Sequence, residues 1–299
     1  MLSRKFNLMK MLLALVLVLS LCGSAMAQGA TALTAQEYQN IVGTYSINEE
    51  IKGYVDYYDE LKDKTRPDAE IVLDAADFVR YEDAGVAVTP VTLPDYEGVA
   101  GQSILTGEES LVEWSFTVPQ SGLYDMSILY HPYVGEADDP YRGKQGVIQR
   151  SFFLDGQLPY TELALVEFER IWVIDGYSET VGEDGLTVRT WTWKQDNQDN
   201  DLKPSALEAP EWVVGELYDT NGYVAEELSL YLTEGEHTLT MMAMREPMVV
   251  RSITFNNSAR PAPYADVKAA GDAAGYVDTV GLTVVVEAEH TTKTSSQML

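Results

Sequence analysis

The amino-acid sequence predicts a mainly β protein, an antiparallel β-sandwich preceded by one or two N-terminal helices. Between residues 69 and 257, apolar and polar residues alternate with a period of two in several short segments. Turns that contain glycine, such as Asp155-Gly156 and Glu234-Gly235, separate those segments. No helical pattern lies between the segments, whereas a parallel sheet needs crossover helices. These observations together favour an antiparallel sandwich.

Residues 1–27 have the pattern of a signal peptide. Basic residues open it: Arg4, Lys5 and Lys10. The apolar run 11–21 is too short for a bilayer, which takes about 20 residues, and no later run could span one. Ala25-Met26-Ala27 fits a signal-peptidase site, so we expect cleavage after Ala27 and a secreted or cell-surface-associated protein.

Cys22 is the only cysteine, and it lies inside the predicted signal peptide. The mature chain would then hold neither a disulfide nor a thiol, which excludes cysteine nucleophiles and cysteine-ligated metals. The alternative is a lipoprotein signal in which Cys22 carries the lipid, although Leu21 stands where such signals have a small residue.

Residues 28–68 form the predicted N-terminal helical segment. Thr34 with Glu37, and Ser46 with Glu49, have the spacing of a capping box. Apolar residues then recur at helical spacing on one stripe: Ile47, Ile51, Tyr54, Val55, Tyr58 and Leu61. Arg66-Pro67 should end the helix. The stripe packs either on its own sandwich or on another domain.

The period changes to two from Ala69 onward. The expected strands lie near residues 71–75, 112–118, 124–130, 152–154, 228–232, 239–243 and 248–255. Residues 176–223 break this rhythm, because they are polar and loop-rich, and 195–201 read QDNQDND. Loops of this length inside compact domains are usually functional or disordered.

The tail predicts further organisation. Residues 258–281 suit a linker, rich in Ala, Pro, Gly and Asp. Thr283 to Glu289, TVVVEAE, is similar to Glu70 to Asp77, EIVLDAAD, so 282–299 reads as the start of a second β unit. One strand cannot make a domain, which suggests an N-terminal fragment of a longer protein. The alternative is that this strand joins the first sandwich.

Charge and motifs exclude several function classes. Asp and Glu number 47 against 20 Lys and Arg, a net charge of −27, which opposes binding to nucleic acid or to anionic lipid. The motifs G-x-S-x-G, H-E-x-x-H and G-x-G-x-x-G are absent. Asn197, Asp199 and Asp201 imitate a calcium loop, but Leu202 replaces its glycine. We therefore expect no cofactor, no metal and no catalysis, although counting acids does not exclude paired-carboxylate chemistry.

Aromatic residues suggest a ligand site along the polar stretch. Trp191 and Trp193 would face the same way on a strand, and flat rings of this kind stack on the apolar faces of sugars while polar side chains bind hydroxyls. The candidate site residues are Trp172, Trp191, Trp193, Asn200, Asp201, Trp212, Tyr223, Arg245 and Glu246. The alternatives are that the rings belong to the core or pin the loop, and that the Arg245-Glu246-Pro247 turn holds a fixed ion pair.

Several phrases resemble the galactose-binding-like jelly roll of carbohydrate-binding modules. They are VEWSFTVPQSGLYDMSILYHP, RSFFLDGQLPY and LYLTEGEHTLTMMAMREPMVVRSITF, and the match covers residues 69–257. Residues 46–257 also resemble the N-terminal region of large extracellular solute-binding proteins of bacterial ABC sugar importers, through NDLKPSALEAPEW, NGYVAEELSLYL and REPMVV.

The second resemblance implies a secreted component of a glycan uptake system. Its partners would be a carbohydrate and, through C-terminal domains beyond Leu299, the importer's membrane subunits. An accessory module of a secreted glycoside hydrolase or lyase, and a structural spacer without a ligand, are the alternatives.

The resemblance to carbohydrate-binding modules also implies a position for a structural calcium, which two glutamates of the opening strand and an aspartate of the last strand hold in such modules. Here Asp74, Ala76 and Arg251 occupy those positions. One carboxylate is lost and the aspartate has become a cation, so we expect no calcium there. An Asp74–Arg251 ion pair should take its place.

Overall fold

The computed structural model describes residues 32–174, 177–181, 187–191, 194–202, 206–258, 262–277, 281, 283 and 293–295. The predicted signal peptide and Cys22 lie outside these residues. Within them, no helix is long and apolar enough to cross a membrane.

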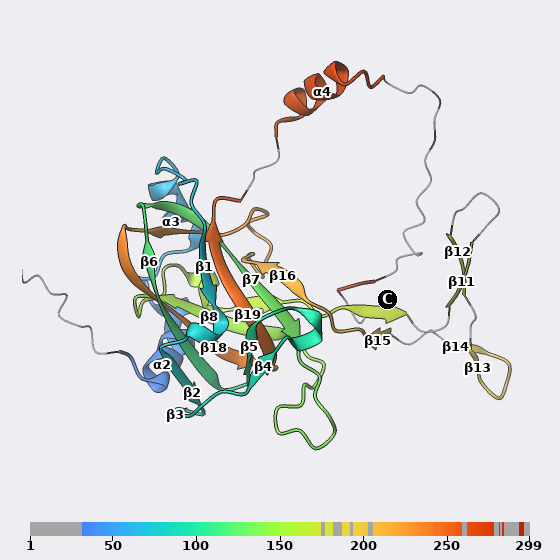
Figure 1. The fold of residues 1–299 in the computed structure, drawn as a ribbon, viewed down its shortest axis with the longest axis horizontal. Coiled ribbons are helices and arrows are strands. Elements are labelled where there is room, and N and C mark those ends of the chain that lie inside the picture. Colours follow the sequence, from blue (N-terminus) through green and yellow to red (C-terminus); the bar gives the residue numbers. More distant parts are fainter. Residues whose placement is uncertain are drawn as a thin grey trace, which may run out of the picture.

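Two antiparallel sheets face each other in a jelly-roll sandwich, as predicted (Figure 1). Among the described residues, sheet A contains β1 (Ile71–Asp74), β4 (Thr92–Pro94), β5 (Gln102–Thr106), β7 (Gly122–Pro132), β16 (Val213–Glu216), β17 (Ser229–Leu232) and β19 (Met248–Asn256). Sheet B contains β2 (Arg80–Asp83), β3 (Val86–Ala87), β6 (Ser110–Val118), β8 (Ile148–Leu154), β9 (Val166–Phe168) and β18 (Gly235–Arg245).

The core lies between the sheets, and the alternation of apolar residues explains it. On β6 the apolar residues Val112, Trp114, Phe116 and Val118 are buried, while Ser115 and Thr117 are exposed. Phe116 of sheet B stacks on Phe255 of sheet A with ring centroids 5.0 Å apart. Burial of apolar area on this scale is the main favourable term in folding.

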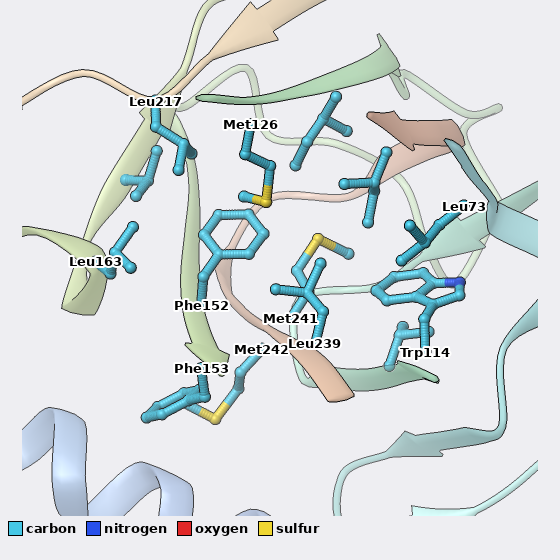
Figure 2. Packing of buried hydrophobic residues seen from close by; sticks show 14 of the residues in the cluster. Leu73, Trp114, Met126, Phe152, Phe153, Leu163, Leu217, Leu239, Met241 and Met242 are labelled. Carbon is cyan, nitrogen blue, oxygen red and sulfur yellow. The ribbon is translucent and has the colours of Figure 1, made fainter. Parts of the chain in front are cut away.

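The other face of sheet B is covered by the first N-terminal helix. Phe152 and Met241 point between the sheets, whereas Phe153 and Met242 point toward the N-terminal helix (Figure 2). Such opposite directions are what consecutive strand residues require. The ring of Tyr38 on α2 (Ala35–Thr44) packs at a tilt against Phe153 with centroids 4.5 Å apart, and its hydroxyl lies 3.2 Å from Thr240 Oγ1. The helical segment therefore packs on its own sandwich.

The helical segment is shorter and more broken than predicted. The capping box of Thr34 and Glu37 is confirmed at the start of α2. The chain continues as η1 (Tyr45–Ile47), leaves the helical conformation at Asn48, and starts again as α3 (Tyr54–Leu61) after Gly53. The single apolar stripe was therefore wrong, since Ile47 is 79% exposed and Val55 is 57% exposed. The break between the helices shifts their phase.

The Asp74–Arg251 ion pair is confirmed. Arg251 Nη1 lies 2.6 Å from Asp74 Oδ2, and Arg251 Nε donates to the Ala100 carbonyl at 2.9 Å. Strands β1 and β19 bring the pair together, because Asp74 stands opposite Ser252 in their register.

Short helices and small two-stranded sheets complete the described chain. The helices are η2 (Ala75–Asp77), η3 (Tyr96–Gly98), η4 (Thr161–Ala164) and α4 (Tyr264–Ala273). The sheets pair β10 (Trp172–Ile174) with β15 (Ala206–Glu208), β11 (Tyr177–Val181) with β12 (Thr187–Trp191), and β13 (Lys194–Gln195) with β14 (Asp201–Leu202). Figure 1 shows β11–β14 apart from the two large sheets. Helix α4 lies within the expected linker 258–281, and most of 282–299 lies outside the described residues.

Candidate functional site

The structure brings two of the sequence-predicted site residues, Trp172 and Arg245, to one cavity of about 760 Å³. We call it the Trp172 cavity. Its walls come from the 145–147 loop, β9 with the residues that follow it, β16 and the end of β18. Pockets of about 300–1,000 Å³ are the usual size of small-molecule sites.

Aromatic rings form the apolar part of the Trp172 cavity. Phe168 and Tyr130 pack edge-to-face at 5.2 Å, and both contact Gly215, where a Cβ would lie 2.8 Å from each ring. A side chain at Gly215 would therefore collide with this part of the wall. The Trp172 side chain is only 3% exposed, and its backbone pairs with Thr294 and stands opposite Glu208.

Polar side chains line the remainder of the Trp172 cavity. The Tyr218 hydroxyl donates to Glu216 Oε2 at 2.7 Å, and Gln149 Nε2 donates to Glu167 Oε1 at 2.8 Å. Arg245 is exposed, and among the described residues no carboxylate forms an ion pair with it. The cavity thus offers both hydrogen-bond donors and acceptors beside apolar rings, a mix that fits a hydroxyl-rich ligand.

A buried ionic cluster supports one side of the Trp172 cavity. Arg170 forms ion pairs with Glu208 and, at 2.8 Å, with Glu246, and its Nε donates to the Gly146 carbonyl at 2.7 Å. Glu246 is 1% exposed and also accepts from the backbone N–H groups of Lys144 and Gly146 at 2.8 and 3.0 Å. The ion pair of this turn is therefore formed by Glu246 with Arg170 and not with its neighbour Arg245, and the Glu246 carboxylate is occupied by the protein.

A second arginine lies behind this cluster. Arg150 is buried and donates to the carbonyls of Gln149 and Arg245 and to Thr106 Oγ1. Burial lowers the pKa of Arg150 to about 9, so the guanidinium is still charged at neutral pH. Its bond to the Arg245 carbonyl holds the backbone from which the exposed Arg245 side chain projects.

Trp212 belongs to a separate aromatic cluster. Its Nε1 donates to the Tyr96 carbonyl at 3.0 Å, and its ring lies edge-on to Tyr96 and His131, with centroids 6.1 and 5.5 Å away. His131 is buried, and burial lowers the pKa of its imidazole. Trp212 thus holds the Tyr96 loop against β7, while its neighbour Val213 lines the Trp172 cavity.

The other predicted site residues either do not line the Trp172 cavity or lie outside the described residues. Asn200 and Asp201 are exposed at the β13–β14 hairpin, where Asn200 bonds to Asp196 and Asp201 accepts from Gln195. Tyr223 is 89% exposed. Trp191, on β12, stands opposite Tyr177 of β11. The Trp191 side chain and all of Trp193 lie outside the described residues.

Comparison with known proteins gave structural neighbours only. No protein-family model and no curated protein matches the chain. The C-terminal CBM6 of LamC, a marine laminarinase from Zobellia galactanivorans, has 11% identity and a TM-score of 0.32, over 63% of this chain and 99% of that one. A family 35 carbohydrate binding module from Clostridium thermocellum has 12% identity and a TM-score of 0.32, over 64% and 99%.

A third neighbour is CBM6cm-2 of Cellvibrio mixtus lichenase 5A, whose structure was solved with cellotriose. It has 10% identity and a TM-score of 0.28, over 63% of this chain and 98% of that one. Similarity at this level leaves the ligand of this chain to be argued from its own residues.

Sequence reasoning missed several residues that line the Trp172 cavity. They are Gln145, Glu167, Glu169 and Glu216. Gln145 has φ +62°, a left-handed conformation that non-glycine residues rarely adopt.

Proposed function

We propose that this protein is a secreted, non-catalytic carbohydrate-binding module whose ligand occupies the Trp172 cavity. The observation that carries the proposal is that the partly exposed Tyr218 ring lines one open cavity together with Arg245, Gln145 and Glu216. Sugars need both kinds of contact, since their C–H faces are apolar and their hydroxyls both donate and accept.

The setting of this module is a second part of the proposal. The resemblance of residues 46–257 to solute-binding proteins supports a role in an ABC-type sugar importer, with the membrane subunits as partners. A role as accessory module of a secreted glycoside hydrolase or lyase fits the same cavity equally well. The sequence that follows Leu299 in the gene would decide between them, by encoding either a two-lobed binding domain or a catalytic domain.

The binding test uses a matched pair of tyrosines. Tyr218 lines the Trp172 cavity, whereas Tyr223 is exposed outside it. After a glycan array has identified a bound saccharide, titration calorimetry should give binding to Tyr218→Ala and to Arg245→Ala that is about tenfold weaker, which corresponds to about 1.4 kcal/mol. Tyr223→Ala should bind like the parent protein.

Two further results would change the proposal. If Trp191→Ala or Trp193→Ala lost binding while Tyr218→Ala bound normally, the ligand site would have to be assigned to the segment around residues 191–193 instead of the Trp172 cavity. Absence of any saccharide binding would favour the structural spacer.

A further inference from the structure

A second cavity lies beside the Trp172 cavity and uses the N-terminal helix as a wall. It has a volume of about 500 Å³, and we call it the α2 cavity. Its lining residues include Thr34, Gln36, Gln39, Arg80, Glu108 and Met244. Arg80 is engaged by Glu82 and by the Leu33 carbonyl. Gln36 Nε2 donates one hydrogen bond to Asn40 Oδ1 at 3.2 Å, so the remaining capacity of the Gln36 and Gln39 amides is what can donate to and accept from hydroxyls.

The two cavities meet at the end of β18. Met244 lines the α2 cavity and the next residue, Arg245, lines the Trp172 cavity, so their Cα atoms are only about 3.8 Å apart. The register between β18 and β8 shifts between Ala243 and Arg245. A bulge of this kind re-aims side chains, and here both Met244 and Arg245 are exposed rather than alternating.

A second connection joins the cavities through an ion pair. Glu108 lines the α2 cavity, and its carboxylate lies 2.7 Å from Lys144 Nζ. Lys144 precedes Gln145, which lines the Trp172 cavity. Both members of this pair are solvent-accessible, with side-chain exposures of 72% for Lys144 and 37% for Glu108. The solvent-accessible side chains of Met244, Arg245, Lys144 and Glu108 thus lie between the two cavities, and we call this set the ridge.

We infer that the two cavities are subsites for one linear oligosaccharide, whose chain crosses this ridge and whose far end is bound by helix α2. The inference rests on the proposed function and extends it to a ligand class. Carboxylates line both cavities, including Glu108 and Glu109 on one side and Glu167, Glu169 and Glu216 on the other. Like charges repel at close range, so the chain is neutral rather than a polyuronate.

The test compares ligand length with the wall of the α2 cavity. The probes are a disaccharide and a hexasaccharide of whichever neutral glycan the array identifies. The hexasaccharide should bind the parent protein at least about tenfold more tightly. In Gln36→Ala/Gln39→Ala, hexasaccharide binding should weaken about threefold to tenfold, as expected for one or two lost hydrogen bonds. Disaccharide binding should stay unchanged in this variant.

The control is Gln102→Ala, which removes an exposed glutamine at the start of β5. Alanine is the best helix former, so the double variant on α2 should fold, and circular dichroism would verify this. Equal affinity for the two probes, or an unchanged hexasaccharide affinity in the double variant, would overturn the two-subsite inference while leaving the proposed function intact. Absence of binding to both probes would instead overturn the proposed function.

Discussion

Arg170 is the residue on which the shape of the Trp172 cavity most depends. It connects three segments that meet there: β15 through Glu208, the β18–β19 turn through Glu246, and the 144–146 loop through the Gly146 carbonyl. Glu208 and Glu246 are both buried at the side chain. A buried ion pair gains little over an apolar pair, but loss of one partner leaves an uncompensated charge.

Arg170→Met should therefore lower the free energy of unfolding by about 3–5 kcal/mol. Urea denaturation followed by tryptophan fluorescence would measure it. The matched control is Arg245→Met, which should change stability by no more than about 0.5 kcal/mol because Arg245 is exposed and forms no ion pair within the part of the chain that the structure describes. Addition of Glu246→Gln to Arg170→Met should restore part of the loss, since it removes one of the two carboxylates that Arg170→Met leaves unpaired. Equal stability of the two single variants would contradict this role of Arg170.

Helix α3 shows how one element protects another. Strand β17 is paired to β7 on one side, and edge strands present unpaired N–H groups that promote aggregation. Tyr54 and Tyr57 cover this edge, because their hydroxyls accept from the N–H groups of Ser229 and Tyr231 at 3.0 and 2.7 Å. Burial raises the pKa of Tyr57 to about 12, so its hydroxyl stays protonated at neutral pH.

Tyr57→Phe should destabilise the protein by about 1–2 kcal/mol, because the N–H of Tyr231 is left without its partner. The double variant Tyr54→Phe/Tyr57→Phe should lose more and should aggregate at lower protein concentration. Chemical denaturation and light scattering would measure the two effects. Tyr223→Phe, at an exposed position, serves as the control. A Tyr57→Phe protein with parental stability would show that water replaces the hydroxyl without cost.

Among the secondary-structure elements, the strands were predicted from the sequence more accurately than the candidate site was. Period-two alternation located β6, β7, β18 and β19, since burial of one face of each strand is a local property of the pattern. The break between α2 and α3 was missed because Ile47 and Val55 suit a helical stripe but tertiary packing leaves them exposed. The Trp172 cavity was found only at Trp172 and Arg245, because its other walls come from segments that are far apart in the chain.

For the whole molecule, the question is whether the jelly roll is complete without the segment before residue 69. Tyr38 and Tyr54 belong to the same buried cluster as Trp114 and Phe255, and Tyr38 covers Phe153 on the outer face of sheet B. Arg66 also bonds to Asp125 on β7 at 3.0 Å and to Ser229 on β17 at 2.7 Å. The helical segment therefore completes one core rather than joining a finished domain.

A chain that begins at Ala69 should consequently lose cooperative unfolding. Removal of one large buried aromatic side chain costs about 3–5 kcal/mol, and the total stability of a domain is about 5–15 kcal/mol, so the loss of Tyr38, Tyr54 and the Arg66 contacts removes most of it. Such a chain should bind a hydrophobic dye and show a broad thermal transition, whereas the chain from residue 32 should show a sharp one. Two equally sharp transitions would mean that the sandwich folds alone, and helix α2 would then be an added wall of the binding surface only.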